Sequence, residues 1–406
     1  MNRNRRSSRF PLKTQLPYFA FLLSSTLLFS GCGGETGGPE GTSVVDSAGV
    51  ALVTGPGADR PLEWSAERVL QIQPLQEEGE GFFGVTDLGV LSGDRIAVLD
   101  GDAKRIVVFD ETGSFLIQYG REGSGPGEFQ YPLELAPRAD GGVSVFDMMN
   151  RRLERFDEAL FPQAPDPLQG VSYFGGGIAF AGAFMVLPTV DYSLPAPRPQ
   201  ILMAMGRADT LELVRYVREQ GGTITLESCG MRLAGIEPIF APRLLWAPGP
   251  DGWVAVVGTD RYEVDLYHPP DFSLVRRIRR QVPSIQATEA MARATVGDGM
   301  RMMSSAGVRI CDAAEVVEKR GFAPEVPPVA AIAISPAGEI FLQRWAPEGE
   351  DRAIDVLTPD GEYLGTTAPG FPFPEAFLGS DRIVVSERDE LDLASVAVYR
   401  ITRDNQ

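Results

Sequence analysis

The chain has 406 residues, of which 55 are acidic and 37 are basic, so its formal net charge at neutral pH is −18. Such an acidic chain repels phosphate groups, which argues against a nucleic-acid partner. The length could hold two or three average domains, but closed all-β architectures also reach this size as one domain. Internal repeats are therefore the evidence that decides the domain organisation.

The N-terminal 31 residues have the composition of an export signal. Five basic residues lie among the first 13 positions, and an apolar run follows from Leu16 to Phe29. This run is shorter than the roughly 20 residues that a membrane-spanning helix needs, and it predicts a signal peptide over residues 1–31. Without that segment 32 basic residues remain against 55 acidic ones, and the net charge becomes −23.

Cys32 ends the sequence Leu28-Phe29-Ser30-Gly31-Cys32, which resembles a lipobox. The resemblance implies a bacterial lipoprotein in which Cys32 is lipidated and anchors the chain to a membrane, at the periplasmic face or in an outer membrane if the organism has one. Phe29 departs from the motif, which prefers leucine there. The alternative is an uncleaved anchor or an ordinary secretory signal. Residues 33–42 are rich in glycine, so residues 32–42 are expected to be a flexible tether to a domain over 43–406.

Two segments that begin 47 residues apart share one residue pattern. Asp, Arg, an aliphatic residue, Phe and Asp recur at the same offsets in Asp100–Asp110 and in Asp147–Asp157, and Ile354–Leu364 repeats the later half. Each copy follows a turn and a short apolar strand. This pattern is typical of the blades of a β-propeller, because a small sheet that is apolar on both faces can bury them only against neighbouring sheets.

The repeats predict an all-β fold, a six-bladed β-propeller, with seven blades as the alternative. We expect full blades near residues 85–120, 130–165, 245–280, 330–368 and 375–403, and a degenerate blade around 172–222. The apolar segments Val50–Val53 and Val69–Ile72 are available to close the ring in the last blade, which would hide the free sheet edges.

Residues 284–321 break the β pattern and predict a helical insertion between blades. Asp312 and Glu315 have the spacing of a capping box, and Gly321 is placed to end a helix. The cysteines other than Cys32 are Cys229 and Cys311, which can form a disulfide in an exported protein. Two separate buried thiols are the alternative.

The sequence from Gly125 to Asp157 resembles the NHL repeat. The matching residues are Gly125-Pro126-Gly127-Glu128-Phe129, Asp140-Gly141-Gly142-Val143, Arg152-Leu153 and Phe156-Asp157. With the opening Val44–Val50, the chain also looks like uncharacterised six-bladed propeller lipoproteins of environmental bacteria, and this likeness loosens after residue 165. The resemblance implies a ligand-binding propeller or, as in some related propellers, a lyase or lactonase.

The polar residues of the two clearest repeats are the candidate ligand-binding residues. Equivalent turns of different blades converge at one end of a propeller channel, where these side chains would face a ligand. They are Asp100, Asp102, Lys104, Arg105, Asp147, Asn150 and Arg152. The same residues also suit a structural role, since Asp and Asn stabilise turns and Arg can satisfy carbonyl groups.

Little in the sequence indicates catalysis. His268 is the only histidine, which excludes a multi-histidine zinc site. No cofactor is predicted, with Ca²⁺ on Asp100 and Asp102 as the alternative. Trp345 could be an exposed aromatic anchor or a core residue. We expect a non-catalytic binding or scaffolding module for a protein, peptide or glycan; the alternative is a divalent-ion-dependent hydrolase or lyase acting on a small exported metabolite.

Overall fold

The computed structural model describes residues 36–37, 41–74, 81–168, 176–190, 199–206, 210–217, 222–258, 260–304, 307–347 and 349–403. The chain divides into a segment over residues 1–34 and a compact unit over residues 35–406. The predicted signal peptide, Cys32 and most of the predicted tether lie outside the described residues. Within the described part, no helix has the length and apolar character that crossing a membrane requires.

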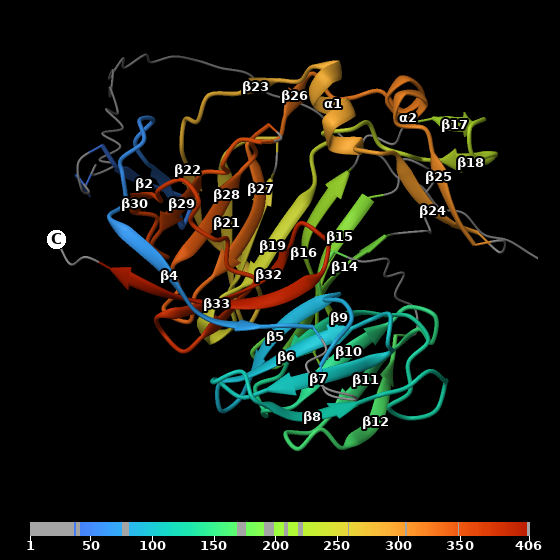
Figure 1. The fold of residues 1–406 in the computed structure, drawn as a ribbon. Helices are drawn as coiled ribbons and strands as arrows, with labels where there is room; N and C mark the ends of the chain where they lie inside the picture. The colour runs from blue at the N-terminus through green and yellow to red at the C-terminus, as the bar shows by residue number, and fades with distance from the viewer. Residues whose placement is uncertain are drawn as a thin grey trace, which may run out of the picture. The chain divides into compact units, whose positions relative to one another are not determined.

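The described residues form six blades of four antiparallel strands each; five blades are separate four-stranded sheets, and blade 4 is part of a seven-stranded sheet (Figure 1). Blade 1 contains β5 (Asp87–Leu91), β6 (Arg95–Asp100), β7 (Arg105–Phe109) and β8 (Phe115–Tyr119). Blade 2 contains β9 (Pro132–Pro137), β10 (Val143–Asp147), β11 (Arg152–Phe156) and β12 (Pro162–Pro167). Blade 3 contains β13 (Ala179–Ala181), β14 (Phe184–Val190), β15 (Pro199–Met205) and β16 (Thr210–Val217).

The remaining blades follow the same order. Blade 4 contains β19 (Leu244–Pro248), the short 3-10 turn η1 (Pro250–Gly252), β20 (Val254–Gly258), β21 (Glu263–His268) and β22 (Ser273–Arg279). Blade 5 contains β27 (Val329–Ile334), β28 (Ile340–Arg344), β29 (Ile354–Leu357) and β30 (Tyr363–Thr366). Blade 6 contains β31 (Ala376–Leu378), β32 (Arg382–Arg388), β33 (Ala394–Arg403) and β4 (Trp64–Ile72). Six blades are therefore confirmed, at the predicted positions.

A strand from the N-terminal part of the chain closes the ring. β4 pairs antiparallel with β33 as the outermost strand of blade 6, as predicted for Val69–Ile72. The expectation for Val50–Val53 is wrong, because these residues lie in β3 (Val50–Thr54), which pairs in parallel with β22 at the outer edge of blade 4. The edge of β33 is already taken by β4, so the N-terminal hairpin covers a different sheet edge.

The N-terminal hairpin extends the sheet of blade 4 by further strands. β2 (Ser43–Ser47) pairs with β3, and β1 (Thr36–Gly37), which lies within the segment predicted to be a tether, pairs with β2. The chain then crosses blade 5, where Leu62 and Thr366 share a backbone hydrogen bond of 2.8 Å, before it enters β4. One N-terminal segment therefore covers the outer edges of three consecutive blades.

Apolar side chains pack between each pair of neighbouring blades. On β6, Ile96 and Val98 face blade 6, where they pack with Val384 and other apolar residues. The alternate residues Ala97 and Leu99 face blade 2 on the opposite side. Similar clusters fill the spaces between the other blades. Each sheet is thus apolar on both faces, which is the physical reason that the blade repeats around a ring.

A buried ion network fastens the crossing N-terminal segment. The fully buried carboxylate of Asp355 accepts hydrogen bonds of 2.6 Å from Arg280, of 2.9 and 2.6 Å from Arg344, and of 2.6 Å from the Tyr262 hydroxyl. Both arginines also pair with Asp59 of the crossing segment, at 3.1 and 2.6 Å. The network therefore joins blades 4 and 5 to the N-terminal segment.

Two segments outside the blades form an insertion. The first contains β17 (Thr223–Leu226) and β18 (Met231–Ala234), between blades 3 and 4. The second, between blades 4 and 5, contains β23 (Ile285–Gln286), α1 (Glu289–Val296), β24 (Met300–Ser304), β25 (Gly307–Cys311), α2 (Ala313–Arg320) and β26 (Glu325–Val326). The predicted insertion at 284–321 is confirmed in position, but a hairpin separates its two helices. Gly297 and Gly299, with φ of 60° and 130°, end α1 before that hairpin.

Candidate ligand-binding pocket

Two of the candidate ligand-binding residues, Asp147 and Asp100, are held by hydrogen bonds within the fold. Asp147 is buried, and its carboxylate accepts hydrogen bonds from the backbone N–H groups of Gln130 and Tyr131 and from the Asn150 side chain, at 2.6–3.0 Å. Asp100 at the equivalent turn of blade 1 is also buried and accepts two backbone N–H groups. Both carboxylates are thus occupied by donors of the turns and of the connections between blades.

The cations of the same turns are held in a similar way. Arg152 donates to the carbonyl of Gly125 at 2.7 Å, and Lys104 donates to a carbonyl of its own turn at 2.7 Å. Arg105 donates to a side chain of β8, and Asp102 is exposed. The structure brings the predicted residues to equivalent turns of blades 1 and 2, and none of them lines the cavities described below.

The described residues contain no group of three or more His, Cys, Asp or Glu side chains that could hold a metal ion. His268 is exposed and stacks on Trp253, with ring centroids 6.1 Å apart. Ca²⁺ at Asp100 and Asp102 therefore stays a prediction from the sequence alone.

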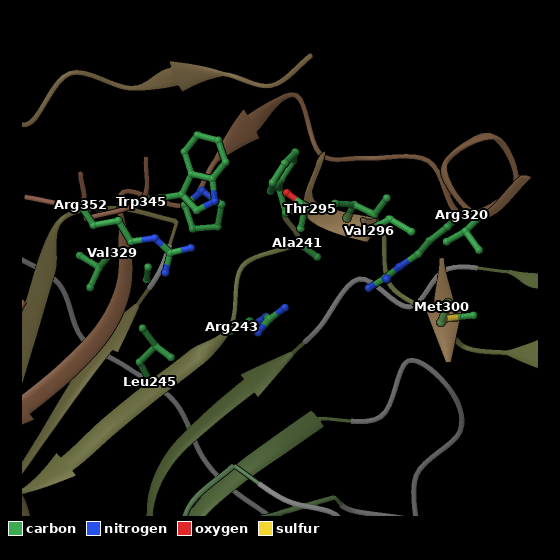
Figure 2. A pocket seen from close by; sticks show the side chains of 15 residues that line it. Ala241, Arg243, Leu245, Thr295, Val296, Met300, Arg320, Val329, Trp345 and Arg352 are labelled. Atoms are coloured by element: carbon green, nitrogen blue, oxygen red, sulfur yellow. The ribbon is translucent and has the colours of Figure 1, made fainter. Parts of the chain in front are cut away.

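A cavity of about 420 Å³ lies where the insertion meets blades 4 and 5 (Figure 2). The first strands of successive blades lie beside one another around the centre of the ring, and β19 and β27 contribute Leu245 and Val329 to the cavity wall. Val296 of α1 lies on the side of the insertion, and Trp345 comes from the loop between β28 and β29. The cavity is therefore built from four separate parts of the chain.

Three arginines line this cavity, which we call the arginine pocket. Arg243 precedes β19, Arg320 ends α2, and Arg352 lies in the loop between β28 and β29. Figure 2 shows the guanidinium groups of Arg320 and Arg352 extending toward the middle of the pocket, where Arg243 lies. No acidic side chain is among the described residues that line it. Glu237 lines an adjoining cavity together with Arg243 and Arg320, so an acidic side chain lies beside two of the three arginines.

The arginines differ in their exposure and contacts. Arg243 and Arg352 are exposed, whereas Arg320 is half-buried and donates a hydrogen bond of 2.5 Å to the backbone carbonyl of Glu237. Burial and, after it, the nearby positive charge of Arg243 lower the pKa of Arg320. The negative charge of Glu237 has the opposite effect on the pKa of Arg320, so this arginine lies near charges of both signs.

Aromatic and aliphatic groups form the rest of the wall. Trp345 is half-buried and packs edge-to-face against Phe240, with ring centroids 5.4 Å apart and an angle of 81°. The residue considered as an anchor therefore lines a cavity. A second cavity, of about 630 Å³, shares Phe240, Arg243 and Leu245 with the pocket and continues along the channel past Trp246.

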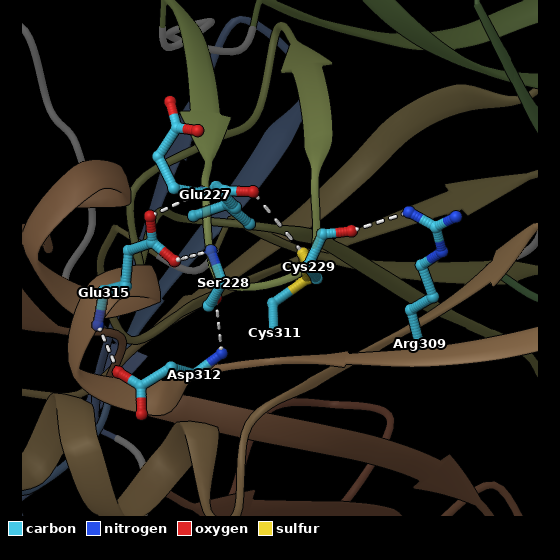
Figure 3. Close-up of a disulfide and its surroundings, with 8 residues drawn as sticks. Glu227, Ser228, Cys229, Arg309, Cys311, Asp312 and Glu315 are labelled. Atoms are coloured by element: carbon cyan, nitrogen blue, oxygen red, sulfur yellow. Dashed lines mark hydrogen bonds between the residues drawn. A yellow bond between two sulfur atoms is a disulfide. The ribbon is translucent and has the colours of Figure 1, made fainter.

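A disulfide joins the two segments of the insertion that form one side of the pocket (Figure 3). It links Cys229, in the turn between β17 and β18, to Cys311 at the end of β25. Beside it, the turn and the start of α2 are joined by hydrogen bonds, because Glu315 accepts from two backbone N–H groups of the turn at 2.6 and 3.0 Å. Insertion segments from either side of blade 4 are therefore fixed to each other.

The same contacts correct the predicted capping box. Asp312 caps α2 as expected, accepting the backbone N–H of Glu315 at 2.9 Å. The Glu315 carboxylate, however, bonds to the hairpin turn, and the Asp312 N–H donates to the Ser228 hydroxyl at 2.9 Å. Asp312 therefore caps the helix as predicted, but the Glu315 side chain contacts the hairpin turn in place of the backbone N–H of Asp312.

The sequence analysis missed all three arginines of the pocket. They lie outside the repeats, carry no motif, and are separated by 77 and 32 positions along the chain. Arg320 shows only the local signal of a basic residue in the last turn of a helix. The one usable indication was the insertion itself, because an interruption of a regular repeat often carries function.

Comparison with known proteins agrees with the fold. A family model described as "6-bladed beta-propeller" (DUF5128) matches residues 82–158, which include blade 1 and most of blade 2. No curated protein sequence matches the chain significantly. The NHL resemblance stays an interpretation of the sequence motif.

Solved structures with similar folds share little sequence with this chain. A "Putative exported protein" from Bacteroides fragilis NCTC 9343 has a TM-score of 0.52 and 9% identity, over 86% of this chain and 99% of the other. A member of the DUF4221 family from Bacteroides vulgatus ATCC 8482 has a TM-score of 0.48 and 10% identity, over 85% and 100%. A streptogramin B lyase has a TM-score of 0.38 and 10% identity, over 84% and 98%. At these identities the comparisons concern the fold alone, and the chain is a six-bladed β-propeller.

Proposed function

We propose that this chain is an exported, lipid-anchored propeller that binds a ligand in the arginine pocket without changing it chemically. The observation that carries the proposal is the convergence of guanidinium, aromatic and aliphatic groups from separate segments on one accessible cavity. A pocket with apolar walls and a few placed polar groups is the usual form of a ligand site. General acid–base catalysis more often uses imidazole or carboxyl groups.

Export is supported by the signal-like N-terminus and by the disulfide between Cys229 and Cys311. Disulfides form and persist in oxidising compartments outside the cytosol. Attachment of lipid at Cys32 would then hold the propeller at the cell envelope. The Cys32→Ala variant is expected to leave the membrane fraction after a salt wash, and a variant that stays bound would contradict the anchor.

Native mass spectrometry of the protein isolated from envelopes in mild detergent tests the binding function. We expect an added mass that is released on denaturation. Ala330→Phe should lose this mass, because Ala330 lines the pocket and a larger side chain would fill it. The matched control Ala337→Phe changes an exposed turn residue and should keep the mass.

Two results would contradict the proposal. An added mass that Ala330→Phe retains at the wild-type level would place the ligand outside the pocket. Recovery of the released ligand in a chemically altered form, after incubation with fresh protein, would show that the protein is an enzyme.

A further inference from the structure

We infer that a further cavity, between the insertion and blade 4, binds an uncharged, apolar organic molecule. The cavity has a volume of about 760 Å³. It is lined by the turn between β20 and β21, by residues that follow β22, and by the segments 237–242 and 322–328. We call it the proline-lined cavity. It shares Phe240, Ala241 and Pro327 with the arginine pocket but extends away from the three arginines, so the inference goes beyond the proposed function.

Two segments of the cavity wall are joined by backbone hydrogen bonds. The Ile239 N–H donates to the Gly321 carbonyl at 2.9 Å, and the Ala323 N–H donates to the Ile239 carbonyl at 2.8 Å. The segments that carry Phe240 and Phe322 are thus fixed to each other. A wall that is already ordered loses little conformational freedom when a ligand binds, which favours affinity.

The wall is apolar and offers few hydrogen-bond donors. Five of its residues are prolines, and a proline has no backbone N–H. The side chains of Phe322, Val282 and Val326 add aromatic and aliphatic surface. The Ala241 N–H is also used, because it donates to the Pro238 carbonyl at 3.1 Å. A polar ligand would lose hydrogen bonds to water without finding partners on this wall, which is costly.

The buried polar groups of the wall are directed into the ion network of the fold. The Arg280 side chain is 0% exposed and pairs with Asp355 at 2.6 Å and with Asp59 at 3.1 Å. The hydroxyl of Tyr262 donates to Asp355 at 2.6 Å. These groups are therefore occupied, and they present their apolar parts to the cavity.

The other charged side chains of the wall also have partners in the protein. Asp260 and Arg261 form an ion pair at 3.3 Å, and Glu325 accepts a hydrogen bond of 3.0 Å from Gln286. Glu237 interacts electrostatically with Arg320. A charged ligand would have to compete with these contacts. The wall therefore favours a ligand without charge.

The volume of the cavity indicates the size of the ligand. Sites for drug-sized molecules have volumes of roughly 300–1,000 Å³ and are lined mainly by hydrophobic and aromatic side chains. The proline-lined cavity lies within this range, so it suits an apolar molecule of several rings or with a comparable chain.

Fluorescence titration with two probes of the same ring system tests the inference. N-phenyl-1-naphthylamine is uncharged, whereas 8-anilino-1-naphthalenesulfonate carries a sulfonate group. The Cys32→Ala protein is titrated without detergent, because micelles would take up the probes. The uncharged probe is expected to bind at least about tenfold more tightly, since the cavity wall offers the sulfonate no free cation and burying an unpaired charge is costly.

Variants of Ala323 locate the binding. Ala323 lines the proline-lined cavity and not the arginine pocket. Ala323→Phe fills the space, and Ala323→Gln places a polar amide in it; each should weaken binding of N-phenyl-1-naphthylamine about tenfold or more. The matched control Ala337→Phe, at an exposed turn, should bind as the wild type does. Thermal unfolding checks the fold, and Ala323→Gln keeps the test open if the larger side chain prevents folding.

Absence of binding, equal affinities for the two probes, or wild-type affinity for N-phenyl-1-naphthylamine in both Ala323 variants would overturn the inference. Ala330→Phe separates it from the proposed function, because Ala330 lines the arginine pocket and not this cavity. If the probe does not bind and Ala330→Phe loses the envelope ligand, only the inference fails. If Ala323→Phe loses the envelope ligand and Ala330→Phe keeps it, the inference stands and the proposed function fails.

Discussion

Asp355→Ala is expected to destabilise the propeller by about 3–5 kcal/mol, because it removes one partner of a buried ion network. The side chains of Asp355 and Arg280 are both 0% exposed and lie 2.6 Å apart. Arg344 adds two hydrogen bonds to the same carboxylate, and the hydroxyl of Thr366 adds another at 2.6 Å. The variant therefore leaves the buried guanidinium of Arg280 without its closest counter-ion.

Asp59 provides a matched control, since it pairs with the same two arginines. Its side chain is 49% exposed, so water screens its charge and Asp59→Ala should cost about 1 kcal/mol or less. Urea-induced unfolding followed by tryptophan fluorescence, with linear extrapolation to water, gives both free energies. Equal losses for the two variants, or a loss below about 1 kcal/mol for Asp355→Ala, would refute the reasoning that burial sets the cost.

Three further predictions concern other parts of the fold. Replacing Cys229 and Cys311 with serine should make the insertion more sensitive to limited proteolysis, while the blades stay resistant. The disulfide joins residues 82 positions apart and contributes about 4.5 kcal/mol on the chain-entropy model. An unchanged rate of cleavage in the insertion would contradict this prediction. Burial raises the pKa of Asp87 to about 7 from 3.8, so the folded state retains a proton that the unfolded state loses and stability falls as the pH rises from about 4 to about 7. The stability of Asp87→Asn relative to the wild type should therefore increase between about pH 4 and pH 7, by at most about 4 kcal/mol, and a pH-independent difference would count against it. Gly120→Ala should lower the midpoint of thermal unfolding more than Gly182→Ala does. A Cβ atom at Gly120 (φ 116°) would lie 2.6 Å from a buried phenylalanine ring, whereas a Cβ atom at Gly182 would have nothing within 4 Å. Equal shifts of the midpoint would argue against steric strain at Gly120.

The blades could be predicted from the sequence because their signals are local and repeated. The short apolar strand expected before the first copy of the repeat is β6 (Arg95–Asp100), and its equivalent before the second copy is β10 (Val143–Asp147). Alternation alone indicates a strand, but repetition at a constant interval identifies the propeller, since only a ring of such sheets buries both faces of each. The degenerate blade expected around 172–222 is blade 3, which lacks a clear copy of the repeat.

The partners of single elements could not be predicted in the same way. Val50–Val53 has the composition of a strand, but nothing in its sequence distinguishes the edge of blade 4 from that of blade 6. Likewise Asp312 shows its helix cap, whereas the bond of Glu315 to a hairpin more than 80 residues away depends on the folded structure. Local chemistry indicates the type of element, and tertiary structure decides its partner.

The candidate site shows the same limit more strongly. The aspartates of the repeats attract attention because they recur, and the structure shows that the turns and the connections between blades occupy them. The arginine pocket does not recur, because it is assembled from Arg243, the end of α2 and a loop of blade 5. At Asp100 and Asp147, recurrence therefore reflects a requirement of the fold, whereas the residues of the pocket come together only in the tertiary structure.

Hydrogen–deuterium exchange of the protein isolated from envelopes, with its bound ligand and after the ligand has been removed, tests the central claim most directly. If the ligand binds in the arginine pocket, exchange should be slower with the ligand in residues 239–245, 293–300, 343–347 and 349–352, while the repeat turns at 100–105 and 147–152 stay unchanged. Protection of those repeat turns instead, with no change around the pocket, would contradict the account and place the ligand at the site expected from the sequence.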